Sequence, residues 1–268
     1  FRRVLFRSTG IGGLKLVGSR DLTHYSKEQI KRIRLVRRAD GYYAQFCLEV
    51  ERKESVAFTG KEIGLDVGLN HFYTDSEGNQ IDNPRYLRKS EKALKRLQKR
   101  LSRKHRRGQP QSARYHKNRV KLARKHLEIS RQRQDHAVKL ARCVIQSNDL
   151  VAYENLSVRN MVKNHGLAKS ISDAGWTQFR EWVDYFGKVF DKVVVPVEPK
   201  YTSQDCSNCG QRVKKSLSVR THVCSCGTSL DRDENAAKNI LAKALKILTG
   251  GQELTLRERR TSTKDKET

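Results

Sequence analysis

The sequence contains no long hydrophobic run. No stretch of its 268 residues approaches the ~18–20 consecutive apolar residues of a membrane-spanning helix, and no signal peptide with an apolar core opens the chain. We therefore expect neither a membrane protein nor a secreted disulfide scaffold. Hydrophobic residues make up 36% of the chain, which is low for a globular domain but enough to form a core.

Acidic residues are also scarce, since 29 Asp or Glu stand against 56 Lys or Arg and give a formal net charge of +27. Such an excess predicts a polyanionic partner, most simply nucleic acid. Most of the excess lies between Arg88 and Arg133, where nineteen Lys or Arg accompany only two acids, Glu91 and Glu128. We therefore expect this segment to contact the partner.

The basic segment is predicted to form a helical hairpin over 88–147. Apolar residues recur at helical spacing on both sides of a single break at Gly108-Gln109-Pro110. The hairpin could be only a solvated charged surface, but such surfaces mix both signs of charge, whereas this one carries like charges that repel. A phosphate backbone would offset the repulsion and make binding steeply salt-dependent. The side chains expected to contact nucleic acid are Lys95, Arg96, Lys99, Arg103, Arg106, Arg107, Lys121, Arg124 and Lys125.

The remaining pattern predicts an α/β fold with a mixed sheet. Short β-branched or alternating segments indicate strands, and longer amphipathic segments indicate helices. We expect, in chain order, a β-hairpin turning at Ala39-Asp40-Gly41, a strand at 63–69, a second strand at 71–75 that turns at 76–79 into a third, a buried strand within 149–156, a polar loop at 157–173, a helix at 176–190, a strand at 192–197 and a final helix at 236–248. The tail at 249–268 is expected to be disordered.

Four of the six cysteines form two close pairs with fourteen residues between them, and a glycine follows each pair. This spacing predicts a tetrahedral Zn²⁺ site that is closed and structural. A disulfide is disfavoured because the charge balance indicates a reducing cytoplasm. The four expected ligands are Cys206, Cys209, Cys224 and Cys226, and His222 is the only nearby alternative; Cys47 and Cys143 are expected to be ordinary buried thiols.

Carboxylates on apolar strands form the second candidate metal site. Asp66 lies between two glycines on the face opposite the apolar residues of its strand, and Glu154 ends another predicted buried strand. The segment Asp231-Arg232-Asp233-Glu234 opens the last helix, with Asp231 as a natural N-cap and Glu234 as its capping-box partner. Carboxylates from separate elements are what Mg²⁺ requires, and spacing alone leaves open which acid of the last helix takes part.

Several ordered motifs resemble the TnpB proteins, the OrfB proteins of IS200/IS605-type elements and relatives of the type V (Cas12) CRISPR nucleases. The resemblance runs from about Ile30 to Leu248. The motifs that carry it are Gly64-Leu65-Asp66-Val67-Gly68-Leu69, Tyr153-Glu154-Asn155-Leu156, Ser172-Asp173-Ala174-Gly175-Trp176, Tyr201-Thr202-Ser203-Gln204-Asp205-Cys206-Ser207-Asn208-Cys209-Gly210 and Asp231-Arg232-Asp233-Glu234-Asn235-Ala236-Ala237-Lys238-Asn239-Ile240.

The resemblance implies a RuvC-like nuclease domain of RNase H type, interrupted by a Cys₄ zinc ribbon. It implies a transposon-encoded DNA endonuclease guided by an RNA from the transposon end, which hydrolyses phosphodiesters with two Mg²⁺ ions. Carried over by position, the catalytic and magnesium-binding acids are Asp66, Glu154 and Asp233, which leaves Asp231 as a cap. The partners would be DNA and guide RNA, with no membrane, in a prokaryotic cytoplasm next to the nucleoid.

The resemblance also implies a domain order. The expected segments are an adapter-like, non-native stretch at 1–8, the end of a β-rich wedge domain at 9–60, the RuvC-like domain at 61–200, the zinc ribbon at 201–230, the last RuvC helix at 231–248 and the tail at 249–268. We expect the chain to be the rear part of a longer, N-terminally truncated protein. We do not expect it to be guided to its target by itself, because the parts that hold guide RNA lie upstream.

Two other functions stay open. The chain could be a transposase that joins DNA ends directly, but such enzymes usually order their acids Asp, Asp, Glu, whereas the order here is Asp66, Glu154, Asp233. It could also be a non-catalytic zinc-ribbon protein that binds nucleic acid. In that case replacement of Asp66 by alanine would leave every activity unchanged.

Overall fold

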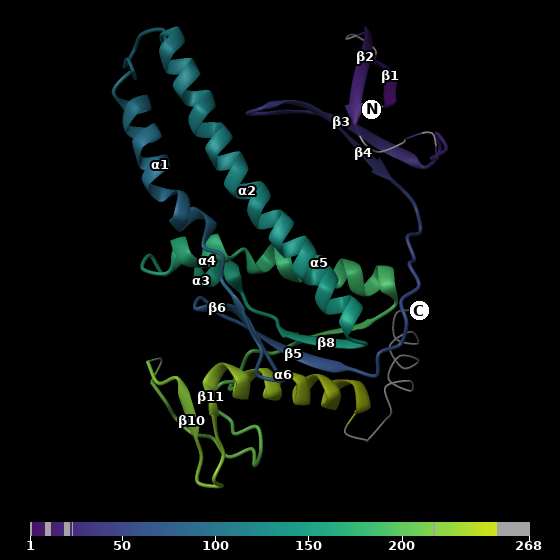
Figure 1. The fold of residues 1–268 in the computed structure, drawn as a ribbon, viewed down its shortest axis with the longest axis vertical. Coiled ribbons are helices and arrows are strands. Elements are labelled where there is room, and N and C mark those ends of the chain that lie inside the picture. Colours follow the sequence, from purple (N-terminus) through teal and green to yellow (C-terminus); the bar gives the residue numbers. More distant parts are fainter. Residues whose placement is uncertain (1, 9–11, 19–21, 23, 217, 251–268) are drawn as a thin grey trace. The chain divides into compact units, whose positions relative to one another are not determined.

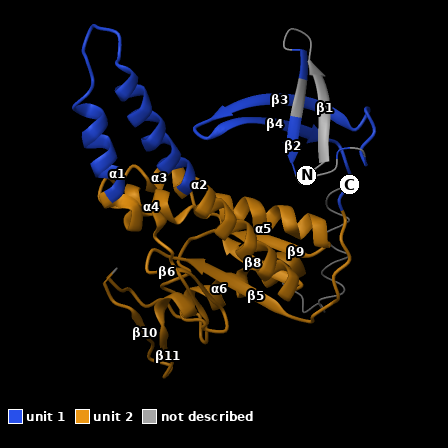
Figure 2. Cartoon of the chain, turned by 45° about the horizontal axis from the view of Figure 1, so that its top comes forward, with its two compact units in different colours: residues 1–52, 93–128 blue, residues 53–92, 129–268 orange. Residues whose placement is uncertain are grey.

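The computed structural model describes residues 2–8, 12–18, 22, 24–216 and 218–250 (Figure 1). The chain divides into two compact units, one formed by 1–52 and 93–128 and the other by 53–92 and 129–268 (Figure 2). Most of the predicted tail lies outside the described residues. Of the helices that are described, none combines the length and the apolar character of a membrane span.

The first unit holds two antiparallel β-ribbons and the outer parts of two long helices. The second ribbon turns at Ala39-Asp40 and confirms the predicted hairpin, and Arg124 Nε donates a hydrogen bond to the Ala39 carbonyl at 3.1 Å. The segment set aside at the start of the sequence forms the first strand of the first ribbon. The elements are β1 (Arg2–Ser8), β2 (Gly12–Gly18), β3 (Ile30–Arg38), β4 (Gly41–Leu48), α1 (Tyr86–Ser102) and α2 (Ala113–Ser147).

A five-stranded mixed sheet organises the second unit, as the pattern predicted. Its strand order is β7-β6-β5-β8-β9; β5 pairs antiparallel with β6 and parallel with β8, and β8 pairs parallel with β9. The parallel pairs place the carboxyl ends of β5, β8 and β9 at one edge of the sheet. The strands are β5 (Glu62–Val67), β6 (His71–Asp75), β7 (Gln80–Asp82), β8 (Leu150–Glu154) and β9 (Val193–Val197).

Helices cover both faces of this sheet (Figure 1). One face packs against α5 (Trp176–Phe190) and the inner part of α2, because α5 turns Phe179, Val183, Phe186 and Phe190 inward as its periodicity predicted. The other face packs against α6 (Arg232–Thr249), whose buried residues meet Leu150 and Ala152 of β8 and the valines of β9. Each face therefore has its own apolar core.

Two expectations were wrong. The stretch 157–173 is not only a loop, because it forms α3 (Val158–Met161) and part of α4 (Ala168–Ala174). Helices of one or two turns are too short to show periodicity in sequence and are stabilised by packing, here of the buried residue Ile171. Cys47 and Cys143 are exposed rather than buried. Cys47 alternates along β4 with the half-buried Phe46 and Leu48, and Cys143 lies on α2 beside the buried Val144 but faces outward.

Candidate functional site

Asp66 and Glu154 lie side by side at the carboxyl edge of the sheet. The last paired positions of β5 and β8 are Leu65 and Tyr153. Asp66 and Glu154 each follow this pair by one residue, so they occupy neighbouring positions on parallel strands and point to the same face of the sheet. The face is that of α6, because Glu154 shares it with Ala152, which packs against α6.

Gly64 lets α6 approach this face closely. A Cβ atom built at Gly64 would lie 2.2 Å from the carbonyl oxygen of Ala237 and 2.9 Å from the amide nitrogen of Leu241. The helix backbone therefore occupies the space that any side chain at Gly64 would need. Asp66 is two residues farther along the same face of the strand.

Asp233 reaches the same place from the helix. It precedes Ala237 by four residues, a step of about 6 Å along a helix, and Asp66 follows Gly64 by two residues, a step of about 7 Å along a strand. The matching steps set Asp233 beside Asp66. Its side chain is 18% exposed, and one carboxylate oxygen lies 3.4 Å from Nη1 of Arg220.

The neighbouring acids of the first turn of α6 have structural roles. Asp231 is the N-cap, and its carboxylate accepts hydrogen bonds from the amides of Asp233 at 2.8 Å and Glu234 at 3.3 Å. Only half of the predicted capping box forms, because the Glu234 carboxylate accepts a hydrogen bond from Lys238 Nζ at 2.7 Å. Asp231 thus stabilises the helix and leaves Asp233 free of a capping role.

The three carboxylates interact electrostatically. Burial, followed by the negative charges of Glu154 and Asp233, raises the pKa of Asp66 well above its usual range. Burial also raises the pKa of Glu154, against the lowering effects of a hydrogen bond from Thr202 and the charge of Lys243. Acids that share a site and repel one another in this way fit a cation that would neutralise them.

Sequence reasoning missed the residues that surround these acids. The hydroxyl of buried Thr202 donates a hydrogen bond to Glu154 Oε1, and Arg220 pairs with Asp233. Thr202 belongs to the motif that opens the cysteine segment, and its position there was the only available signal. Arg220 carries no sequence signal, because a lone arginine in so basic a chain is not distinctive.

The four clustered cysteines form a compact tetrad. Their four Sγ atoms all lie within 4.8 Å of one another. Among the residues that the structure describes, the oxygens of the three carboxylates do not lie as close together. Cys206 Sγ lies 3.7 Å from Cys226 Sγ, and Cys209 Sγ lies 3.6 Å from Cys224 Sγ. Zn–S bonds of 2.3 Å would set tetrahedral sulfurs about 3.8 Å apart, so the tetrad fits zinc.

Tight turns and short strands hold the tetrad. The amides of Gly210 and Gly227 donate to the carbonyls of Cys206 and Cys224 at 2.9 and 3.0 Å, and both glycines have positive φ values of 76° and 89°. The short strands β10 (Thr221–Val223) and β11 (Ser229–Asp231) pair antiparallel beside the second turn. His222 is buried and its Nδ1 contacts Lys215 Nζ, so it lies outside the tetrad.

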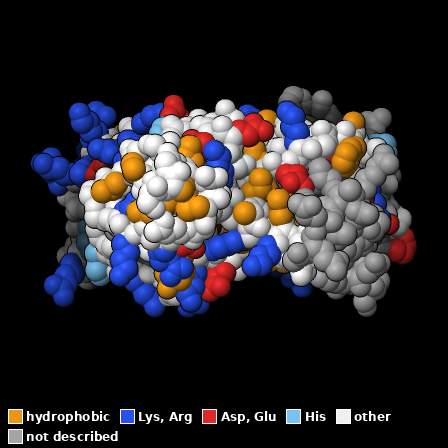
Figure 3. All heavy atoms as spheres, turned by 90° about the horizontal axis from the view of Figure 1, so that it is seen from below, with side chains coloured by type: hydrophobic (Ala, Val, Ile, Leu, Met, Phe, Trp, Pro, Cys, Tyr) orange, Lys and Arg blue, Asp and Glu red, His pale blue; other side chains and the backbone are white. Residues whose placement is uncertain are grey.

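The basic side chains predicted to bind nucleic acid lie on the outer parts of α1 and α2 and the turn between them. Eight of the nine are exposed; Lys125 is half-buried and bonds Glu128 at 2.8 Å. Lys and Arg side chains also outnumber acidic ones on the face of the molecule in Figure 3. A polyanion would therefore meet an almost unopposed positive charge.

Comparison with known proteins shows which families the chain resembles. Residues 45–165 match the OrfB_IS605 family, described as "Probable transposase", and residues 176–240 match the family described as "Cas12f1-like, TNB domain". A Streptomyces pristinaespiralis protein named "Putative RNA-guided DNA endonuclease" is 38% identical over 70% of this chain and 46% of its own length. Across these segments the chain resembles the TnpB/OrfB proteins.

A second relative matches a larger share of this TnpB-like chain. The Escherichia coli K12 protein named "Putative RNA-guided DNA endonuclease InsQ" is 29% identical over 90% of the chain and 62% of its own length. The chain thus spans between about half and two thirds of the length of these two relatives. A solved Cas12f1–sgRNA–target DNA complex aligns with a TM-score of 0.45 and 17% identity, over 78% of this chain and 55% of that one.

The two family matches divide the candidate site of this TnpB-like chain. Asp66 and Glu154 fall in the segment that matches OrfB_IS605, whereas Asp233 and the cysteine tetrad fall in the segment that matches the TNB domain. The packing of α6 on β5 is what joins the two segments into one site.

Proposed function

We propose that this TnpB-like chain contains the nuclease centre of a transposon-encoded, RNA-guided DNA endonuclease. The observation that carries the proposal is the convergence of Asp66, Glu154 and Asp233 at one edge of the sheet, where burial and then repulsion by the other two acids raise the pKa of Asp66. The mixed sheet with helices on both faces is compatible with a RuvC-like domain of RNase H type, into which the cysteine ribbon would be inserted. The names of the relatives supply the RNA guide and the DNA substrate.

The three acids would hold two Mg²⁺ ions, and the chemistry that such ions would supply is activation of a water and stabilisation of the leaving oxygen of a DNA phosphodiester. Thr202 orients Glu154 by its hydrogen bond, and α6 fixes the side chain of Asp233 against the strand that bears Asp66. Arg220 lies within reach of Asp233 and supplies a positive charge at the same edge. The cysteine tetrad would hold a structural zinc ion.

Asp233 and Asp231 provide a matched test, because both lie within one turn of α6. Asp233→Asn is expected to abolish Mg²⁺-dependent DNA cleavage. Asp231→Asn should leave it intact, because asparagine is as good an N-cap as aspartate. Cleavage is measured in a full-length, RNA-loaded protein that carries these residues, and Mn²⁺ binding to this chain by titration calorimetry. If Asp231→Asn removes cleavage and Asp233→Asn does not, or if neither variant loses Mn²⁺, the site is wrongly assigned.

Loss of zinc provides a second prediction. Cys206→Ser is expected to reduce the zinc content measured by mass spectrometry from a full equivalent to almost none, because three thiolates cannot close a structural site. The ribbon should then become sensitive to limited proteolysis within 201–230. Cys47→Ser is the matched control, since Cys47 is exposed and far along the chain from the tetrad. Retention of zinc in Cys206→Ser would contradict the assignment.

The basic hairpin is proposed to contact the backbones of guide RNA and DNA. Replacement of Lys95, Arg96, Lys99 and Arg103 by glutamine should reduce the slope of log affinity against log salt by up to about 4, because each lost phosphate contact removes about 0.9. Equivalent replacement of Lys139, Arg159, Lys163 and Lys188 in the second unit is the charge-matched control. An equal loss of slope in both variants would show that only net charge matters.

A further inference from the structure

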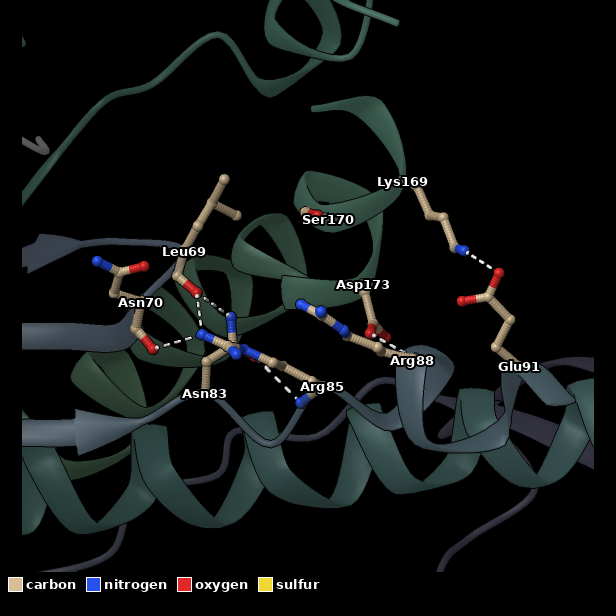
Figure 4. A pocket seen from close by; sticks show the side chains of 9 residues that line it. All are labelled: Leu69, Asn70, Asn83, Arg85, Arg88, Glu91, Lys169, Ser170 and Asp173. Carbon is tan, nitrogen blue, oxygen red and sulfur yellow. Dashed lines mark hydrogen bonds and ion pairs between the residues drawn. The ribbon is translucent and has the colours of Figure 1, made fainter. Parts of the chain in front are cut away.

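A polar pocket of about 410 Å³ opens near the carboxyl end of β5, within the second unit (Figure 4). Its walls are the turn after β5, the first turns of α1 with the segment that precedes them, and α4. This volume is typical of ligand sites, and the carboxyl ends of parallel strands are where α/β sheets usually bind ligands. The pocket is not lined by the three carboxylates, the four cysteines or the nine basic side chains named above; its residues Arg88 and Glu91 lie at the start of the basic segment.

The acids of the pocket are already engaged. Asp173 is buried and accepts hydrogen bonds from Nη2 of Arg133 at 2.8 Å and from the amide of Leu87 at 2.9 Å. Glu91 pairs with Lys169 at 2.7 Å. The negative charges are therefore balanced within the fold, and the positive charges of Arg85 and Arg88 remain.

Two arginines present these charges to the pocket. The guanidinium of exposed Arg88 has no hydrogen-bond or ion-pair partner among the described residues, and the hydroxyl of Ser170 has none either. Arg85 is held in a left-handed conformation with φ of 49°, and its guanidinium lies 3.5 Å from the carbonyls of Leu69 and Asn70. The fold thus fixes the position of the Arg85 guanidinium and leaves the Arg88 guanidinium available to a ligand.

Two guanidinium groups and a hydroxyl facing one recess suit a phosphate group. Arginine donates paired hydrogen bonds in a plane that matches phosphate oxygens. A second hollow, lined by His71, Asp82 and Lys89, shares Arg85 with the pocket and continues it along the surface.

The pocket lies close to the carboxylates. Leu69 is three residues after Asp66, so their Cα atoms are separated by at most about 11 Å. We propose that the pocket binds a backbone phosphate of the nucleic-acid strand whose scissile bond lies at Asp66, Glu154 and Asp233. This inference rests on the proposed nuclease function and adds a strand-holding site to it.

The test measures binding, so that it does not depend on cleavage. In the full chain carrying Asp233→Asn, Arg88→Gln is expected to weaken binding of a 12-nucleotide DNA strand and to lower the salt slope by about 0.7, the value for one single-strand phosphate. Lys188→Gln, which removes an exposed charge from α5, should leave the slope unchanged. Arg88→Lys should give a salt slope between those of Arg88→Gln and Lys188→Gln, because it keeps the positive charge and loses the planar guanidinium.

A footprint locates the contact. The DNA strand should protect Arg88 from phenylglyoxal, as mapped by mass spectrometry, while exposed Arg159 stays reactive. Equal slopes for Arg88→Gln and Lys188→Gln, together with an unprotected Arg88, would overturn the inference. Protection by inorganic phosphate or a mononucleotide but not by the DNA strand would also overturn it. Protection of Arg88 in the Asp233→Asn chain, together with no Mg²⁺-dependent cleavage when Asp233 is intact, would instead refute the nuclease proposal and leave the phosphate site standing.

Discussion

Replacement of Asp66 by asparagine is expected to reduce DNA cleavage by roughly 10³-fold and at the same time to stabilise the metal-free fold. Bound metal ions contribute several kcal/mol of transition-state stabilisation, and each 1.4 kcal/mol corresponds to tenfold in rate. Asp66 is the acid whose pKa is raised most plainly by burial and by its two neighbours. Its negative charge is therefore unfavourable in the folded chain until a cation is bound.

The sign of the pH dependence follows from this raised pKa. The folded chain holds the Asp66 proton more tightly than the unfolded chain, whose carboxyl group titrates near pH 4. The stability of the wild-type chain should thus fall as pH rises from about 4 through the folded-state pKa of Asp66. Asp66→Asn should lack this loss and unfold at a higher temperature at pH 7.5.

Thermal unfolding without added Mg²⁺ at pH 5 and pH 7.5 measures the effect. Glu181→Gln is the matched control, because the exposed Glu181 side chain lies on α5, across the sheet from α6, and should change neither stability nor cleavage. Added Mg²⁺ should raise the melting temperature of the wild type and not that of Asp66→Asn. A destabilised Asp66→Asn variant, or one that still cleaves DNA, would contradict the proposed role.

Replacement of Gly64 by alanine is expected to destabilise the fold by about 3 kcal/mol or more. The new methyl group would lie 2.2 Å from the Ala237 carbonyl and 2.9 Å from the Leu241 amide, so helix or strand must move. Movement of α6 would carry Asp233 away from Asp66. Urea unfolding and Mn²⁺ affinity should therefore both fall.

Gly166→Ala is the matched control, because its added Cβ would approach only a side-chain oxygen, at 3.4 Å. It should leave unfolding and Mn²⁺ binding unchanged. If Gly64→Ala is as stable as Gly166→Ala, then the close packing of α6 on β5 is not what joins the two halves of the site.

Much of the fold could be predicted because its elements carry strong local signals. The alternation that ends at Asp66, the β-branched run of β9 and the phenylalanines of α5 each fix an element and its buried face. The short helix α4 could not be predicted, because it depends on contacts distant in sequence. Asp173 in α4, for example, bonds the start of α1 and Arg133 of α2.

The candidate acids and cysteines were proposed from the sequence, but the residues that contact them were not. Acidic residues on apolar strands are conspicuous in a basic chain, and paired cysteines have a characteristic spacing. Thr202 and Arg220 have ordinary surroundings in sequence, and only the fold brings them to Glu154 and Asp233. The buried ion pair of Asp149 and Lys192, 43 residues apart, was likewise beyond reach, since no pattern links its partners.

The junction between β11 and α6 limits how the protein can be shortened. Asp231 is both the last residue of β11 and the N-cap of α6, and Asp233 follows two residues later. Asn235 and Asn239 of the same helix donate hydrogen bonds to the carbonyl of Asp205, at the start of the cysteine segment. A shortened protein in which a flexible linker replaces the ribbon would thus lose the hydrogen bonds to Asp205 at the start of that segment and the Asp231 N-cap at its end. Any smaller replacement has to be a rigid bridge of the same span.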